Sequence, residues 1–431
     1  MIRTLVRAIA SVLLASAVHA GETSLHEYEL DNGMKVLVRA DERAPVVVSQ
    51  VWYRVGSVDE HRGVTGVSHA VEHMMFKGTN DYAPGQMSQI IAGLGGEENA
   101  FTSRAYTAYY QQIGAQHLDR MLELEAERMS DLRFPEAEVD SEMQVVREER
   151  RQRVEDQPRA LVHERLRAAA LPSSPARSPV IGWRGDLESM TRSDLVQWYE
   201  QWYGPNNAAV VVVGDVEPER VLELARRHFG AKKAVELPPR PARSELEPRG
   251  ETRLEVAASA KLPYLAMAWR VPSLATAEQA DDVYALDVLA AILDGGRSAR
   301  LQRNLVRGQQ MASSASASAL ESALDDEIAA LKAGEIDTQE LERVKTNVRA
   351  RDVFERDSMF YQALCLGRLE MTGVGQDAYD AYLEGVEAVT AADVARVAKA
   401  YLVDERLTVA RLVPQGVDGA GQGAAPTGQD P

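Results

Sequence analysis

The stretch MTRSDLVQWYEQWYGPNNAAVVVVGDVEPERVLELARRHFG, from Met190 to Gly230, says most about the fold. It predicts an amphipathic helix, a turn, the strand AAVVVV, a Gly-Asp turn and a second helix that begins at Pro218. A run of small and β-branched apolar residues is typical of a strand that is buried on both faces. The stretch therefore predicts a sheet with helices packed against it.

The end of the chain repeats part of this pattern. Thr191 is followed by an aspartate three residues later, then by Tyr203 and the valine strand. Thr390 is likewise followed by an aspartate three residues later, then by Tyr401 and the apolar run Leu407–Val413. Both threonines stand where a helix N-cap is expected. The repetition predicts a duplicated α+β domain, and the alternative is a coincidence of two ordinary capped helices.

Composition divides the chain of 431 residues further. Residues 234–250 are rich in proline and charge, which is typical of an extended linker. Residues 414–431 have the Gly/Pro/Gln composition of a disordered tail. We therefore expect a first domain over residues 21–233 and a second domain over residues 251–413.

Residues 1–20 have the composition of a signal peptide. Arg3 and Arg7 precede a short apolar run, and small residues end at Ala20. We expect cleavage after Ala20 and a periplasmic or secreted protein, the alternative being an uncleaved helix at the membrane interface. No later apolar run is long enough to span a membrane, so we expect no span after signal cleavage.

Charge and cysteine content narrow the class of protein. The formal net charge is −17 at pH 7, and an acidic surface repels phosphate, so we expect no nucleic-acid partner. Cys365 is the only cysteine, so an internal disulfide is excluded and stability must come from burial.

A histidine pair lies in the stretch GVSHAVEHMMFKGT, from Gly66 to Thr79. His69 and His73 are four residues apart, so on a helix they share one face and can bind one ion. Glu72 stands beside them in the H-x-x-E-H order, which is typical of zinc peptidases whose carboxylate activates a water molecule. The alternative is a pair of histidines packed in an ordinary helix and bonded to backbone.

A catalytic zinc needs a third protein ligand, and the helical stretch Pro135–Asp156 is rich in acids. Its apolar seam consists of Val139, Met143 and Val146. At helical spacing Glu142 and Glu149 lie along the inward side, whereas Glu148 lies opposite and should face water. The spacing favours Glu149 as the ligand, with Glu142 behind it. The alternative for both is half-exposed ion pairing with Arg150 or Arg153.

Several segments in the same order resemble one known family, the M16 metallopeptidases of pitrilysin, insulinase and mitochondrial processing peptidase. The matching segments are VWYRVGSVDE (Val51–Glu60), GVSHAVEHMMFKGT, GLGGEENAFTSRAYTAYYQ (Gly93–Gln111), VVREERRQR (Val145–Arg153), PVIGWRGDLESMT (Pro179–Thr191), WYGPNNAAVVVVGDV (Trp202–Val216) and LDGGRSARLQRNLVR (Leu293–Arg307). They run in family order across most of residues 25–310, and such an ordered series is far more specific than the five-residue motif alone.

The resemblance implies one Zn²⁺ per chain, held by His69, His73 and Glu149, with Glu72 as the general base. Glu142 corresponds to a supporting acid of the family. The implied activity is that of a zinc-dependent endopeptidase that hydrolyses peptides or unfolded polypeptides. The competing interpretation is a non-catalytic subunit that binds or stabilises a partner. This chain keeps every residue of the implied metal site, which favours the enzyme.

The family also implies a fold and a partner. Its fold class is α+β, with two homologous α/β-sandwich domains that form one half of a clamshell. The other half would come from a homodimer or from a heterodimer with a second M16-like subunit. Asn99 and Ala100 correspond to a strand that lies along the bound peptide, the alternative for Asn99 being a simple turn residue.

This sequence departs from the family pattern in two places. Ala70 and Val71 replace a bulkier pair between the histidines, which should be tolerated because neither is a ligand. After Met311–Ser318 the sequence passes directly into the helical pattern of Ala319–Asp337. The second domain is therefore expected to be shortened and to lack strands. The segment SSASASA fits either a strand or a loop.

Overall fold

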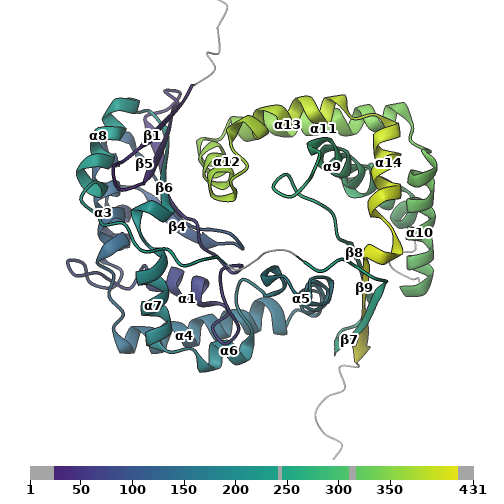
Figure 1. Ribbon diagram of the computed structural model, residues 1–431, viewed down its shortest axis with the longest axis horizontal. Coiled ribbons are helices and arrows are strands. Elements are labelled where there is room, and N and C mark those ends of the chain that lie inside the picture. The colour runs from purple at the N-terminus through teal and green to yellow at the C-terminus, as the bar shows by residue number, and fades with distance from the viewer. Residues whose placement is uncertain (1–23, 241–244, 310–316, 416–431) are drawn as a thin grey trace, which may run out of the picture.

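The computed structural model describes residues 24–240, 245–309 and 317–415 (Figure 1). The predicted signal peptide with its cleavage site, and all but the first two residues of the predicted tail, lie outside these residues. So does most of SSASASA, whose last three residues begin a helix at Ala317. Within the described residues, every helix is too short or too polar to cross a membrane.

The first domain is built on a six-stranded sheet in the order β1-β2-β6-β3-β5-β4. Its strands are β1 (Leu25–Glu29), β2 (Lys35–Ala40), β3 (Val46–Tyr53), β4 (Glu97–Thr102), β5 (Thr107–Gly114) and β6 (Ala208–Gly214). Strand β6 is the valine strand, and all of its residues are buried, as the sequence predicts. Strand β4 lies at one edge of the sheet, so one side of its backbone is available for pairing.

Helices cover one face of this sheet and share with it a single apolar core. They are α1 (Val67–Met74), α2 (Gln86–Gly93), α3 (Leu118–Ser130), α4 (Glu136–Arg150), α6 (Arg184–Ser189), α7 (Arg192–Trp202) and α8 (Pro218–Phe229). Short 3-10 turns over Ala115–His117, Pro175–Arg177 and Pro205–Asn207 connect several of them. Beyond α4 the chain continues as a π-helix, η2, over Arg151–Glu155.

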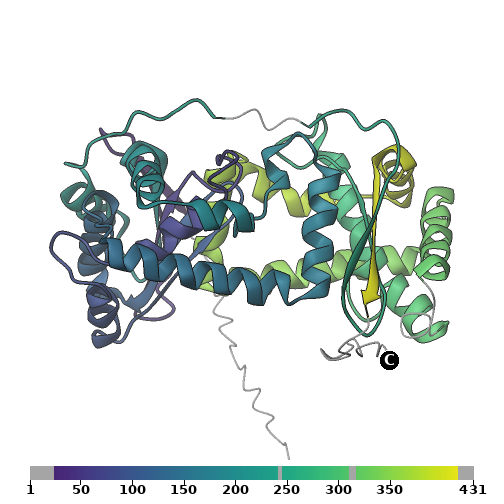
Figure 2. The same ribbon diagram turned by 90° about the horizontal axis from the view of Figure 1, so that it is seen from below.

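The second domain contains a three-stranded sheet in the order β7-β9-β8. Its strands are β7 (Thr252–Ser259), β8 (Tyr264–Trp269) and β9 (Leu407–Gln415), and its helices are α9 (Ala280–Asp294), the π-helix η5 (Leu301–Gly308), α10 (Ala317–Ala333), α11 (Thr338–Arg356), α12 (Met359–Thr372), α13 (Gln376–Ala388) and α14 (Ala391–Tyr401). Between α8 and β7 the described residues form no helix or strand, and Figure 2 shows them crossing from one domain to the other.

The two domains share one core arrangement. Strand β6 pairs with β2 in parallel and with β3 in antiparallel orientation, and β9 pairs with β7 and β8 in the same two ways. Thr191 caps α7 and Thr390 caps α14, each through a capping box with the aspartate three residues later. Both predicted N-caps are confirmed. Counterparts of β1, β4 and β5 are missing from the described part of the second domain, in agreement with the expected shortage of strands.

Each domain lends one helix to the sheet of the other. Helix α5 (Pro158–Ala170) follows α4 in the chain but packs its Val162 and Leu166 against β7, β8 and β9. Helix α12 packs its Ala363 and Leu366 against the open face of the first sheet, beside Trp52. Figure 1 shows both helices against these strands. Each sheet therefore has one face that is covered by a helix of the other domain.

The close contact between α12 and the first sheet predicts that one added methyl group lowers the stability of the fold. A Cβ atom on Gly367 would lie 2.0 Å from the Trp52 ring, so Gly367→Ala must displace either helix α12 or the Trp52 side chain. We expect it to lower the free energy of unfolding by about 1–3 kcal/mol in urea denaturation. Gly185→Ala, in a helix with open space around it, is the control and should be neutral or stabilising by up to about 1 kcal/mol. Equal effects of the two substitutions would contradict the tight contact.

Candidate metal centre

Helix α1 carries the histidine pair, and its first turn is fixed by a carboxylate that precedes the usual capping positions. The helix begins after Gly66, which has a φ of 89° and provides no side-chain cap. Instead, the carboxylate of Glu60 accepts hydrogen bonds from the backbone N–H groups of Gly66 (2.8 Å) and Ser68 (3.0 Å). Burial raises the pKa of Glu60 to about 7, although these N–H groups act in the opposite direction. Glu60 thus replaces the missing local cap.

A loop from further along the chain closes over the same end of α1. The Thr65 hydroxyl and backbone N–H both donate to Asp186, and Trp183 N donates to Thr65 Oγ1 at 2.9 Å. Gly182 lies so close that a Cβ atom there would be 2.3 Å from the Thr65 carbonyl oxygen. The start of α1 is therefore held between Glu60 and this loop.

Helix α4 brings the third acid to the histidines. Glu149 Oε2 lies 3.6 Å from His69 Nε2 and 3.4 Å from His73 Nε2. One ligand atom from each of these three residues lies within 4.8 Å of the others. Two atoms that each coordinate one zinc ion at about 2.0–2.1 Å with tetrahedral geometry are roughly 3.4 Å apart. The two separations from Glu149 are long for hydrogen bonds but match edges of a zinc tetrahedron.

Glu142 supports this group from behind. Its Oε2 lies 3.0 Å from His73 Nδ1, which leaves His73 Nε2 directed at Glu149. Its Oε1 lies 2.7 Å from Lys77 Nζ. The contacts with Lys77 and His73 outweigh partial burial and lower the pKa of Glu142, so it stays ionised. A carboxylate on the far nitrogen of a liganding histidine fixes the ring and its tautomer.

His69 is the more buried histidine. Burial, and next the charge of His73, lowers the pKa of His69 to about 4. The ring therefore stays neutral near pH 7, as a metal ligand must be. His73 differs, because its contacts with Glu149 and Glu142 outweigh the effect of burial and raise its pKa. The contact with His73 in turn lowers the pKa of Glu149.

Glu72 lies beside these three residues but is not part of the group that could hold a metal ion. Its carboxylate accepts a hydrogen bond from the Thr102 hydroxyl at the end of β4. Thr107, which donates to the Val55 carbonyl oxygen at 3.0 Å, stands 3.5 Å from Thr102 and supports it. Burial raises the pKa of Glu72, which suits a group that accepts and returns protons.

Comparison with known proteins places this arrangement in a family. Residues 35–183 match the family described as insulinase, peptidase family M16, and residues 189–326 match the peptidase M16 inactive domain. The zinc protease PqqE of Helicobacter pylori is 30% identical over an alignment 433 residues long, which covers 94% of this chain and 96% of that protein. This chain belongs to the M16 peptidase family.

Other M16 relatives and structures agree. An uncharacterized zinc protease of Mycobacterium tuberculosis, Rv2782c, is 31% identical over 277 residues, which cover 63% of this chain and 61% of that protein. A protease structure from Helicobacter pylori matches with a TM-score of 0.86 at 29% identity, covering 91% of this chain and 100% of that one. The first half of the periplasmic protease PqqL from Escherichia coli shares the fold, with a TM-score of 0.72, 19% identity and coverage of 91% and 92%.

The structure places the other predicted residues as follows. Glu148 is exposed and pairs with Arg151 at the surface, as its position opposite the apolar seam predicts. Asn99 and Ala100 lie in the middle of edge strand β4 rather than in a turn. Three supporting residues, Glu60, Lys77 and Thr102, were not singled out from the sequence, although each lies within a segment that resembles the M16 family. Their roles depend on contacts across the fold, which spacing alone does not reveal.

The support from Glu142 predicts a change in metal affinity. In Glu142→Gln the neutral amide is a weaker acceptor for His73 Nδ1–H and loses the ion pair with Lys77, so zinc affinity should fall by about 10–100-fold in competition with a chelator. Glu138→Gln is a matched control, because Glu138 lies one turn earlier and also approaches Lys77, at 3.9 Å. Equal losses in both variants would show that only the charge near Lys77 matters.

Proposed function

We propose that this M16 protein is a zinc-dependent endopeptidase that hydrolyses peptides or unfolded polypeptides. The observation that carries the proposal is the convergence of His69, His73 and Glu149 on one point. Glu72 lies beside this point and does not belong to the group that would bind the metal. A second helix and an edge strand surround the same point. The names of the relatives as zinc proteases support the same conclusion.

The donor set fits zinc. Two imidazole nitrogens and one carboxylate are a common set of three protein ligands at catalytic zinc sites, which leave a further position for water or substrate. When bound by His69, His73 and Glu149, zinc supplies a Lewis acid that polarises a peptide carbonyl and makes water a better nucleophile. Glu142 and Lys77 hold the ligand His73 in place.

Glu72 acts as the general base and then as the general acid. Its carboxylate accepts a proton from the attacking water and returns it to the amide nitrogen that leaves. The Thr102 hydroxyl binds one carboxylate oxygen, Oε2, and so fixes the orientation of the group. The raised pKa that burial gives Glu72 brings it closer to the working pH, which favours both transfers.

The free edge of β4 presents the substrate-binding surface. Ser103 N donates to Tyr106 O, so the alternation of the antiparallel ladder leaves the N–H of Ala100 pointing away from β5. In the free protein this N–H donates to Asn99 Oδ1 at 2.8 Å. An extended peptide that pairs with β4 takes over the Ala100 N–H, and main-chain pairing accepts many sequences. Thr102, on the same strand, brings the peptide next to Glu72.

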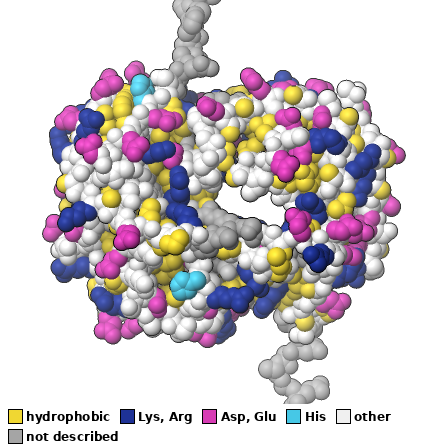
Figure 3. Space-filling view, in the orientation of Figure 1, with side chains coloured by type: hydrophobic (Ala, Val, Ile, Leu, Met, Phe, Trp, Pro, Cys, Tyr) yellow, Lys and Arg dark blue, Asp and Glu magenta, His cyan; other side chains and the backbone are white. Residues whose placement is uncertain are grey.

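We further propose that the chain is exported through its first 20 residues and works with a second M16 half, either another copy or a related subunit. The chain covers 48% of full-length PqqL, a periplasmic protease of Escherichia coli, so that protein is about twice as long. A dimer would supply the missing length. On the face shown in Figure 3 acidic and basic side chains are mixed over most of the surface, and Lys and Arg side chains gather near the centre of its lower edge.

The proton role of Glu72 predicts a selective loss. Glu72→Gln should lower kcat on an unfolded peptide by about 10²–10⁴-fold, because the amide cannot accept the proton. Zinc content should not change, since Glu72 is outside the ligand group. Glu97→Gln, an exposed acid on β4, is the control and should keep full activity. A parent protein that binds zinc without turnover would instead favour the non-catalytic subunit.

The β4 edge makes a separate prediction about substrate capture. Ala100→Pro removes an N–H that the ladder with β5 does not use, so the fold should persist. Loss of this hydrogen bond should lower kcat/KM by roughly 2–10-fold, mainly through KM. Ala100→Ser keeps the N–H and should behave as the parent. Unchanged kcat/KM in the proline variant would mean that the peptide does not pair with this strand.

A further inference from the structure

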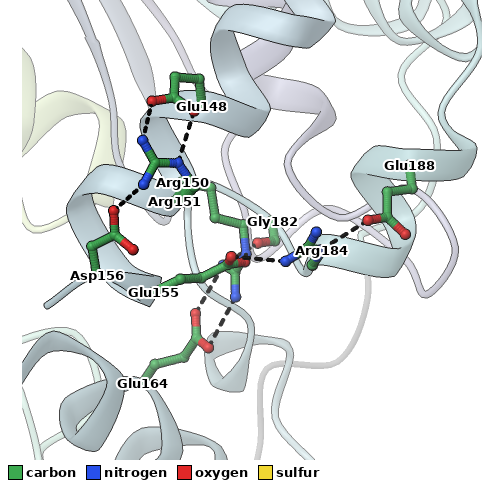
Figure 4. A network of polar contacts seen from close by, with 9 residues as sticks. All are labelled: Glu148, Arg150, Arg151, Glu155, Asp156, Glu164, Gly182, Arg184 and Glu188. Atoms are coloured by element: carbon green, nitrogen blue, oxygen red, sulfur yellow. Dashed lines mark hydrogen bonds and ion pairs between the residues drawn. The ribbon is translucent and has the colours of Figure 1, made fainter. Parts of the chain in front are cut away.

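Arg150 follows the ligand Glu149 directly but points into a different environment. Its guanidinium forms two parallel bonds with Glu164 of α5, at 2.9 Å and 3.1 Å, and donates to the Gly182 carbonyl oxygen at 2.6 Å (Figure 4). The Arg150 and Glu164 side chains are only 6% and 5% exposed. Glu155 approaches the same guanidinium at 3.3 Å. Such a planar, bidentate pair fixes direction as well as distance.

The position of Arg150 in α4 gives this pair its importance. The apolar contacts of α4 with the core end at Val146, and Arg150 is the only buried residue of the helix beyond it. Immediately afterwards the helix widens into the π-helix Arg151–Glu155. Glu149 therefore lies in a last turn that apolar packing does not hold. Arg150 is the buried side chain that anchors this turn, beside two more exposed contacts: Arg147 Nη1 donates to the Leu187 carbonyl oxygen at 3.2 Å, and Arg153 pairs with Glu149 Oε1 at 2.6 Å.

The partner of Arg150 connects this turn to the second domain. Val162 and Leu166, four residues apart on α5, pack against the second sheet. Glu164 lies two residues from each, so it projects from the opposite side of α5, toward Arg150. Helix α5 is thus clamped between the second sheet on one side and the end of α4 on the other.

The third contact of Arg150 reaches the histidine helix. Gly182, which accepts from Arg150, lies against Thr65 and Gly66 at the start of α1. The same guanidinium therefore contacts the loop that packs against the start of α1 and also contacts α5, which faces the second sheet. Arg150 thus connects the helix of the two histidines with the helix that docks on the second domain.

We propose that Arg150 and Glu164 are positioning residues that set the place of Glu149 relative to the two histidines and so make zinc affinity depend on the docking of α5 against the second domain. The inference rests on the proposed function, because it treats Glu149 as a zinc ligand. It assigns the second domain a part in building the metal centre, although all three residues of the candidate centre lie in the first domain.

If the Arg150–Glu164 pair only stabilised the fold, a variant that lacks the pair but stays folded would bind zinc as the parent does. Such a variant can be made, because replacing both members of a buried ion pair by apolar residues of similar size often leaves stability unchanged or raises it. The double variant Arg150→Met/Glu164→Leu should therefore remain folded, with a melting temperature near that of the parent, while it loses the direction that the pair imposes. Fold and metal affinity can thus be read separately.

The experiment measures zinc dissociation constants of the full chain by chelator competition, and the absorption spectrum of bound Co²⁺ as a report on ligand geometry. The double variant should bind zinc about 10–100-fold more weakly than the parent and show an altered Co²⁺ spectrum. Glu148→Gln is the matched control, because it breaks the exposed pair with Arg151 one residue before Glu149. The control should leave both readouts unchanged.

Each outcome decides between the possibilities. Parent-like affinity and spectrum in the folded double variant overturn the inference and leave the proposed function intact. If the double variant does not fold, Arg150→Lys takes its place. Lysine keeps the charge but not the fork, so zinc affinity should fall, and parent-like affinity overturns the inference. A parent chain that binds no zinc overturns the proposed function itself.

Discussion

The contact between α1 and α4 is the constraint on which the candidate site depends. Two histidines on one helix offer two ligands, and the third lies on a helix that begins far along the chain. Met143 and Val146 bury themselves in the core that also contains Val71 and Met74 of α1. That packing brings α4 alongside α1, and the polar contacts of the last turn of α4 then place Glu149 at 3.4–3.6 Å from the two histidine nitrogens. The candidate metal centre therefore depends on core packing first, and any change that separates the two helices should weaken it.

The exchange of α5 and α12 makes the two domains depend on each other. Each sheet has one face covered by its own helices and another covered by a helix of the other domain. Lys35 and Arg54 on the first sheet both bind Glu370 of α12 at 3.0 Å, which adds a polar attachment to the apolar one. The second domain thus supports the first even though the described part of its sheet has only three strands.

Local patterns predicted a large part of this structure. The valine strand, both threonine caps and the inward direction of Glu142 and Glu149 follow from periodicity and short-range hydrogen bonds, which the sequence encodes within a few residues. The outward direction of Glu148 follows from the same helical spacing. The order of the family segments supplied the rest of the site.

Long-range choices were not predictable in the same way. An apolar face on α5 shows that something covers it, but not that the cover is the second sheet. Glu60 caps α1 from six residues before Gly66, outside the usual capping positions. The pairing of Arg150 with Glu164 needs the turn between α4 and α5 to be known. Each of these depends on tertiary packing rather than on propensity.

The most direct test of the account is the zinc content of the purified chain and of Glu149→Ala by mass spectrometry, with cleavage of an unfolded peptide measured on the same samples. The account predicts about one zinc per chain and turnover in the parent, with both lost in the variant. A parent chain without zinc, or a variant that keeps its zinc, would contradict the assignment of His69, His73 and Glu149 as the metal centre.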